Sequence, residues 1–314
     1  MGESGPSVLG FGVITIDDVL YVDAIPHPDH RARVLERHVR AGGNTACALA
    51  TAARLGAEAA FIARLGDDEY SKLARAELAK YGVDLSYVLN HGGTGLVLST
   101  IIVGADTGHR TVLSDRSRLV QVEPGELREE WFDGPRVLMI DYLHQPTTLR
   151  AAKLAKAAGM EVISDFEREG ELFEDVIPHV DHFICSEPFA LSYTGCKDAV
   201  EAVRRMRSGG EHRVVAVTVA EKGCYWATRE EAAVYRQPAM QVEAADTTGC
   251  GDVFRGAYCC ALLEGQDVKQ RMLWSTAAAG LMATKTGGWA GIPTAAEVKG
   301  ALRAHPPAEP QVVG

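Results

Sequence analysis

The sequence lacks long apolar runs: none of its apolar stretches reaches 18 residues in a chain of 314. A membrane-spanning helix needs about 20 such residues, so the sequence predicts no membrane partner. The first residues, Met-Gly-Glu-Ser-Gly-Pro, also lack a basic region followed by an apolar core. We therefore expect no signal peptide and a cytoplasmic protein.

Paired cysteines are also missing, because the seven cysteines are scattered, odd in number and contain no Cys-x-x-Cys. This pattern argues against a disulfide framework or a cysteine metal site and indicates a reducing compartment. Positive charge is scarce as well, since 32 Lys and Arg stand against 42 Asp and Glu for a net charge of −10. A chain of this charge is not expected to bind nucleic acid, and any anionic ligand must be held by local positive groups.

What the sequence does contain is an alternation of short apolar runs and helical patterns. Residues 8–14, 137–140, 161–164, 183–185 and 214–219 read as buried strands, and helical segments separate them. This alternation predicts an α/β fold with a mostly parallel sheet and helices on both faces. Residues 17–40 and 95–115 read as antiparallel strands and a hairpin outside that core. We expect one domain over residues 1–305 and a loose, proline-rich tail over residues 306–314.

The most informative stretch is Asp246-Thr-Thr-Gly-Cys-Gly-Asp252, which precedes an apolar helical pattern. Glycines at a helix N-terminus let backbone N–H groups point at an anion. A carboxylate such as Asp252 suits mere anion binding poorly, but it suits removal of a proton from a hydroxyl that attacks a phosphoryl group. The structural alternative is an aspartate that only caps the helix.

This stretch resembles the C-terminal signature of the ribokinase/PfkB family of sugar kinases, and Ala41-Gly42-Gly43-Asn44 resembles its N-terminal signature. The resemblance runs from Val8 to about Leu302 and implies a ribokinase-like three-layer α/β/α fold with a small β-strand lid. Cys250 stands where the family usually has alanine. The resemblance implies Asp252 as the general base, with Gly249, Cys250 and Gly251 supplying N–H donors to the developing charge.

The resemblance also implies the sugar-binding residues. Asp17 and Asn44 would bind sugar hydroxyls, with Asp18 as the alternative to Asp17 and a helix N-cap as the alternative role for Asn44. Gly43 would let the sugar approach the backbone. Arg116 resembles the ketohexokinase arginine that reaches the phosphates, although a solvated surface arginine is the alternative.

For the nucleotide, the resemblance implies MgATP. The segment Val217–Gly223 resembles the family segment along the nucleotide, and Gly288 belongs to a loop that resembles the one closing over adenine. The residues implied at this site are Thr218, Glu221, Gly223, Thr247, Gly249, Gly251 and Gly288. Glu221 has a solvated turn as its alternative. In many relatives the Asp246 region and that loop also hold a monovalent cation, so K⁺ is a further candidate.

The metal ligands are not implied in the same way. The family's Asn-x-x-Glu motif should fall near Ile184-Cys-Ser-Glu-Pro-Phe, where Ser186 and Phe189 replace its Asn and Glu. We therefore assign Mg²⁺ no ligand from the protein.

A homodimer through the lid is implied by the spacing from Asp17 to Asp29, at which ketohexokinase-like enzymes send a carboxylate into the partner's sugar site. Val19, Tyr21, Leu98 and Ile101 would lie on such a surface, with packing against the sheet as the alternative.

The acceptor is left open between several sugars. Residues 14–19 and 99–116 favour a ketohexokinase-like or fructokinase-like acceptor over ribose. Other segments resemble sulfofructose kinase, but no arginine stands near Leu143 where that enzyme binds its sulfonate. Arg255 is a candidate for contact with an anionic substrate group. The alternatives are a nucleoside kinase, for which the lid offers little aromatic surface, or a non-catalytic sugar-binding relative, which would not need Asp252.

Overall fold

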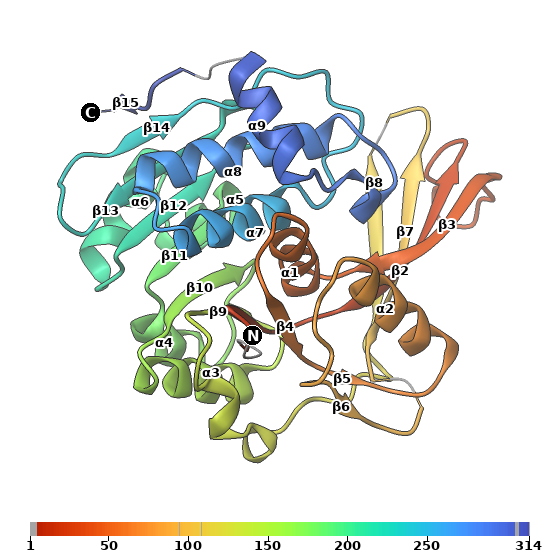
Figure 1. Cartoon of the computed structure of the whole chain (residues 1–314). Helices are drawn as coiled ribbons and strands as arrows, with labels where there is room; N and C mark the ends of the chain where they lie inside the picture. Colours follow the sequence, from red (N-terminus) through yellow and green to blue (C-terminus); the bar gives the residue numbers. More distant parts are fainter. Residues whose placement is uncertain (1–4, 94, 108, 305–307, 314) are drawn as a thin grey trace.

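The computed structural model describes residues 5–93, 95–107, 109–304 and 308–313 (Figure 1). In these residues a main sheet of nine strands has the order β15-β14-β13-β12-β11-β10-β9-β1-β4. The strands from β12 to β4 are all parallel, whereas β13, β14 and β15 are antiparallel to their neighbours. The prediction of a mostly parallel sheet is thereby confirmed. In chain order the strands are β1 (Val8–Phe11), β4 (Ala59–Ile62), β9 (Val137–Asp141), β10 (Glu161–Phe166), β11 (His182–Ser186), β12 (Val214–Thr218), β13 (Cys224–Thr228), β14 (Tyr235–Gln237) and β15 (Gln311–Val312).

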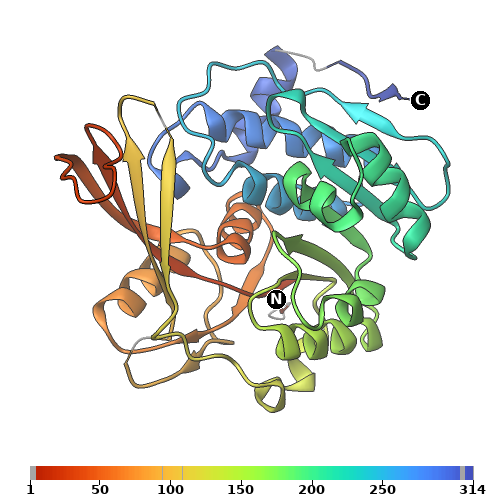
Figure 2. The same cartoon turned by 180° about the vertical axis from the view of Figure 1, so that it is seen from behind.

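Helices cover both faces of this sheet, as Figures 1 and 2 show from opposite sides. Successive side chains of a strand point to opposite faces, so Val8 and Leu9 of β1 belong to two different apolar clusters. The cluster of Val8 includes side chains of α1, α2, α7, α8 and α9, and the cluster of Leu9 includes those of α3, α4, α5 and α6. The helices are α1 (Asn44–Arg54), α2 (Glu69–Lys80), α3 (Gln145–Ala157), α4 (Phe173–Val176), α5 (Glu187–Thr194), α6 (Ala199–Gly209), α7 (Cys250–Leu263), α8 (Val268–Ala283) and α9 (Ala295–Ala304).

Helices α1 and α7 lie unusually close together because one of the facing residues is a glycine. A Cβ placed on Gly256 of α7 would lie 2.3 Å from the carbonyl oxygen of Ala48 and 2.7 Å from Cβ of Thr51. Atoms at such distances would overlap, so this contact requires glycine. The close packing sets the N-terminus of α1, with Asn44, beside that of α7, with Asp252.

A second sheet of four strands forms the lid, in the order β3-β2-β7-β8. It extends from the body of the molecule on the right of Figure 1. Pairing is antiparallel between β2 and β3 and between β7 and β8, which confirms the predicted antiparallel strands and the hairpin. Strands β2 and β7 are parallel. The lid strands are β2 (Thr15–Val22), β3 (Val34–Gly42), β7 (Val97–Gly104) and β8 (Arg110–Asp115), and a two-stranded sheet of β5 (Arg64–Leu65) and β6 (Leu89–Asn90) lies apart.

Several boundaries differ from those expected from the sequence, and two of these differences change the course of the chain. The first strand ends at Phe11 rather than at residue 14, because the chain leaves the main sheet there and enters the lid at Thr15. The C-terminal segment, predicted to be a loose tail, contributes β15, whose residue Val312 pairs with Tyr235 of β14. Of that segment, residues 306, 307 and 314 lie outside the described part. No helix in the described ranges is long and apolar enough to cross a membrane.

Candidate active site

The candidate site lies where the lid faces the carboxyl ends of the parallel strands and the N-termini of α1 and α7. In open α/β sheets this edge is where ligands bind. Asp141 ends β9, Asp165 lies near the end of β10, and the Asp246–Asp252 segment, called the anion loop below, leads into α7. Most residues predicted from the sequence for the transfer and for the sugar are placed here.

Helix α7 begins at Cys250, before the apolar helical pattern that follows Asp252 in the sequence, so Asp252 lies within its first turn. Its N-cap is Gly249 with φ of 80°, a left-handed conformation that glycine adopts without strain. The Cys250 N–H donates to the carbonyl of Thr247 at 3.3 Å and closes the turn. The N–H groups of a first helical turn have no acceptor within the helix, so this end of α7 is suited to an anion.

Asp252 is a partly buried carboxylate among charged neighbours. Burial raises its pKa well above the ordinary value, and the negative charge of Asp165 adds to that rise. The Arg255 guanidinium acts in the opposite direction. The thiol of Cys47, itself buried with a pKa well above its usual range, is hydrogen-bonded to the Asp252 carboxylate. A carboxylate with a raised pKa is a stronger base than an exposed one.

The sugar side of the site is formed by Asp17 on β2 and the Gly42-Gly43-Asn44 turn. Thr15 Oγ1 donates to Asp17 Oδ1 at 2.7 Å, and burial raises the pKa of Asp17. A Cβ on Gly42 would lie 2.1 Å from Asp17 Oδ2. Gly43 has φ of 96°, and a Cβ there would lie 2.6 Å from the carbonyl oxygen of Val13. Any residue other than glycine would therefore be strained at position 43, because its φ is positive and its neighbours are backbone atoms, whereas glycine at position 42 leaves space for the Asp17 carboxylate.

The structure distinguishes the surroundings of the alternatives on this side. Asp18 pairs with Arg37 through two hydrogen bonds of 2.8 and 2.9 Å, whereas Asp17 lies against Gly42 of the Gly42-Gly43-Asn44 turn. Asn44 is not a helix N-cap, because Gly43 holds that position and no side chain caps α1. Instead, Asn44 Nδ2 donates to Asp165 Oδ1 at 3.4 Å.

Two lid arginines that the sequence did not single out reach the anion loop. Arg110 Nη1 donates to Thr248 Oγ1 at 2.9 Å. Arg40 Nη2 lies 4.0 Å from Asp246 Oδ2, and its side chain packs over Gly288. By contrast, Arg116 is exposed beyond the end of β8, and within the described residues its side chain makes no hydrogen bond or ion pair. The arginine predicted near the phosphates is thus not the one that contacts this loop.

The predicted nucleotide residues are only partly brought together. Thr247 precedes α7 in the anion loop, and Gly288 is buried under Arg40 in the short 3-10 helix η5 (Gly288–Gly291). Thr218 ends β12 and donates through Oγ1 to the carbonyl of Cys185 at 3.4 Å. Glu221 is exposed on the 3-10 helix η4 (Ala220–Lys222).

Gly223, the remaining nucleotide candidate, has a structural reason to be glycine. Its φ is 98°, and a Cβ would lie 2.0 Å from the carbonyl oxygen of Gln237. Its identity therefore follows from the close approach of two backbone segments. Asp29, predicted to act across a dimer, is exposed on the turn between β2 and β3 at φ of 64°.

Sequence reasoning missed two buried carboxylates at the strand ends. Asp141 accepts hydrogen bonds from the N–H of Val13 at 2.6 Å, from Thr45 Oγ1 at 2.8 Å and from the N–H of Leu143 at 3.0 Å. Burial raises the pKa of Asp141 to about 6. Asp165 is 1% exposed, and burial likewise raises its pKa to about 6. Each follows a predicted strand directly, a position that could have identified both.

Arg255 was a candidate for an anionic substrate group, and the structure contradicts this. Its side chain is 4% exposed and its Nη1 lies 3.1 Å from Asp165 Oδ1. A guanidinium that is buried and already paired does not offer a surface for a ligand.

No cluster of three or more His, Cys, Asp or Glu side chains suited to a metal ion occurs in the part of the chain that the structure describes. Ser186, at the place of the motif's Asn, is the N-cap of α5, and Phe189, at the place of its Glu, is buried.

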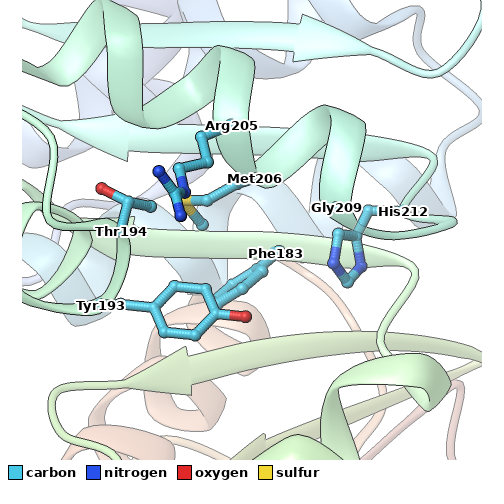
Figure 3. Close-up of a pocket in the computed structure, with 7 residues that line it drawn as sticks. All are labelled: Phe183, Tyr193, Thr194, Arg205, Met206, Gly209 and His212. Carbon is cyan, nitrogen blue, oxygen red and sulfur yellow. The ribbon is translucent and has the colours of Figure 1, made fainter.

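A cavity of about 240 Å³ lies away from this site, between β11, α5 and α6. Figure 3 shows its lining, in which Tyr193 and His212 lie on either side of Phe183 and Arg205 approaches from α6. Thr194 at the end of α5 marks the opposite end of the strands from the anion loop. The cavity is therefore not part of the candidate active site.

Comparison with known proteins gives consistent matches over nearly the whole chain. The model of the pfkB family carbohydrate kinases matches residues 6–295. The chain is 25% identical over 295 residues to a ribokinase of Haemophilus influenzae, covering 91% of this chain and 95% of that protein. It is 28% identical over 318 residues to fructokinase-1 of Oryza sativa subsp. japonica, covering 93% and 96%. The structure of Arabidopsis thaliana ribokinase complexed with ribose and ATP matches with a TM-score of 0.84 at 21% identity, covering 95% of this chain and 99% of that one.

Proposed function

The chain belongs to the pfkB family of carbohydrate kinases, and from this membership we propose that it transfers the γ-phosphoryl group of ATP to a hydroxyl of a ketose such as fructose. The observation that carries the proposal is the position of Asp252. Its carboxylate lies in the first turn of α7, next to N–H groups suited to an anion and beside the residues predicted to bind a sugar.

Asp252 acts in this proposal as the general base on the attacking hydroxyl. A neutral hydroxyl is a weak nucleophile, and a carboxylate with a raised pKa removes its proton as the bond to phosphorus forms. Gly249 and Gly251 place no side chain at their own positions in the anion loop, so the N–H groups there can stabilise the charge that develops on the transferred group. The Cys250 N–H donates to Thr247 and chiefly holds the turn.

Asp17 and Asn44 orient the sugar through its hydroxyls. Asp17 is held by Thr15, and Asn44 is held by Asp165, so both side chains have fixed orientations before a sugar binds. Fixed polar partners give selectivity because a sugar that lacks the matching hydroxyl leaves them unpaired. The ketose assignment rests on the resemblance of residues 14–19 and 99–116 to ketohexokinase-like and fructokinase-like enzymes.

The nucleotide lies along the anion loop. In the proposal, Thr247 and Gly288 lie beside the phosphates of the nucleotide. The end of the nucleotide that is farther from the loop is contacted by Thr218, Glu221 and Gly223. Arg110 and Arg40 replace Arg116 as the cations that face the phosphates, because their side chains already reach the loop. Mg²⁺ neutralises phosphate charge when bound with ATP. K⁺ beside Asp246 stays a candidate that requires its own test.

A homodimer through the lid is part of the proposal. Six large apolar residues are exposed in the described ranges, and five of them lie on the two edge strands of the lid. They are Val34, Leu35 and Val39 on β3 and Val112 and Leu113 on β8, and the sixth is Val312. Of the residues predicted for such a surface, Val19 is buried and does not belong to it. Asp29 would reach the partner's sugar in this dimer.

The test is a coupled ADP-release assay with MgATP against ketoses, aldoses, pentoses and nucleosides, run on the wild type and Asp252→Asn. We expect release with one class of sugar and a loss of at least about 100-fold in kcat for the variant. Release with nucleosides alone would contradict the sugar assignment. Full activity of Asp252→Asn would exclude Asp252 as the base.

A further inference from the structure

The proposed base, Asp252, belongs to a cluster of three charged side chains whose other two members, Arg255 and Asp165, are buried. A single nitrogen of Arg255, Nη1, lies 3.1 Å from Asp165 Oδ1 and 3.9 Å from Asp252 Oδ1. The side chains of Arg255 and Asp165 are 4% and 2% exposed, whereas that of Asp252 is 19% exposed. The guanidinium therefore lies between a fully buried carboxylate and one that can meet a substrate.

The cluster is anchored to four elements. Arg255 follows Asp252 by three residues on α7, which places both on one face of the helix. Its Nε donates to the carbonyl of Ile184 on β11 at 3.3 Å. Asp165 comes from β10 and accepts from Asn44 of α1. The position of Arg255 is therefore fixed independently of Asp252.

A buried guanidinium and a buried carboxylate are each costly to desolvate, and each depends on the other for compensation. Oδ2 of Asp165 is buried without a hydrogen-bond partner among the described residues, so the charge of Asp165 is compensated at Oδ1, chiefly by Arg255. With all three groups ionised, the cluster holds two negative charges and one positive charge. Removing the buried charge of either Arg255 or Asp165 therefore changes the net charge beside Asp252.

Few other titratable groups face Asp252. Cys47 on α1 and Cys250 on α7 are thiols whose pKa values are raised by burial, so both are neutral at ordinary pH. Glu167 follows β10, is exposed to solvent and interacts with Asp252 over a longer range. Asp165 and Arg255 are therefore the two charges that dominate its surroundings.

We propose that Arg255 and Asp165 are positioning residues for phosphoryl transfer, which hold Asp252 in place and set its charge balance from opposite directions. The proposal rests on the proposed role of Asp252 as the base. Arg255 keeps the carboxylate ionised and oriented toward the sugar. Asp165 limits that effect, so that Asp252 stays basic enough to take a proton.

The test measures the titration of Asp252 directly, without a substrate. The whole protein is labelled with ¹³C at the aspartate carboxyl groups and titrated by NMR, and Asp252 is identified by the signal lost in Asp252→Asn. We expect Asp165→Asn to move the titration midpoint of Asp252 down by about one pH unit and Arg255→Gln to move it up by about as much. Glu167→Gln is the matched control, because its exposed charge is screened and should move the midpoint less than Asp165→Asn.

The same shifts should appear in the acidic limb of the pH profile of kcat/KM, measured with MgATP and the sugar found by the ADP-release assay. If Arg255→Gln does not fold, Arg255→Lys keeps the charge and should hold the midpoint near that of the wild type while kcat falls. Midpoints that stay fixed, or that move in the same direction in Asp165→Asn and Arg255→Gln, would refute the proposal. If Asp252→Asn loses activity but the titration midpoint of Asp252 is unchanged in Asp165→Asn and Arg255→Gln, this inference is refuted and the proposed function is not.

Discussion

The contact between α1 and α7 provides a test of how the site is held together from a position outside it. In Gly256→Ala, the new methyl group would lie 2.3 Å from the carbonyl oxygen of Ala48, whereas an ordinary contact of carbon with oxygen is about 3.3 Å. The two helices must therefore separate by roughly 1 Å. Overpacking of this kind typically costs about 1–3 kcal/mol of stability. We expect a fall in Tm of several degrees for a chain of this size.

The effect on catalysis should exceed the effect on stability, because α1 carries Asn44 and α7 carries Asp252. A displacement of roughly 1 Å between groups that position and activate a substrate can cost on the order of 100-fold in rate. The assay is kcat/KM at a temperature at which the variant is fully folded, alongside thermal unfolding.

Gly300→Ala is the matched control for this substitution. Gly300 lies on α9, and a Cβ there would meet no atom within 4 Å. Because alanine favours a helix over glycine by about 0.5–1 kcal/mol, the control should leave kcat/KM unchanged and hold or raise Tm. Equal behaviour of the two variants would refute the argument that close packing of α1 and α7 sets the geometry of the site.

Two further predictions concern the lid. Arg110→Gln removes the hydrogen bond from the lid to the anion loop and should raise the KM for ATP about tenfold in steady-state kinetics. The control Arg116→Gln removes an exposed arginine and should leave that KM within about twofold. Equal effects of the two variants would contradict the assignment of Arg110 to the phosphates. Val112→Glu combined with Leu113→Glu should shift the protein from dimer to monomer in analytical ultracentrifugation. The control Val312→Glu changes the exposed apolar residue outside the lid and should leave the dimer intact. A monomeric wild type would exclude the lid dimer.

Local patterns predicted much of the fold and part of the site. Alternating apolar runs identified the parallel strands, and the glycines of the anion loop and of the Gly42-Gly43 turn marked the two helix N-termini. These features depend on neighbours in sequence, where backbone conformation and periodicity act directly. The glycine φ values of 96° at Gly43 and 80° at Gly249 agree with the turns expected there.

The features that were missed depend on contacts across long sequence separations. Arg255 lies 90 positions from Asp165, and nothing in either local pattern indicates that they pair. Arg110 reaches Thr248 only because the lid folds over the sheet edge, so the choice between Arg110 and Arg116 could not be made from the hairpin alone. The β15 strand was missed because a two-residue strand in a proline-rich segment gives no periodic signal.

The lid is joined to the core beside the site by very short connections. Three residues link β1 to β2, and Gly43 alone lies between β3 and α1. At the opposite end of β2 and β3, the turn of residues 23–33 does not connect to the core, so its length is not restricted in this way. In the proposed lid dimer, insertions and substitutions there would change the contacts between subunits while Asp17 and Asn44 keep their register. Such an arrangement would let the outer edge of the lid vary over evolutionary time without moving the residues proposed to act in phosphoryl transfer.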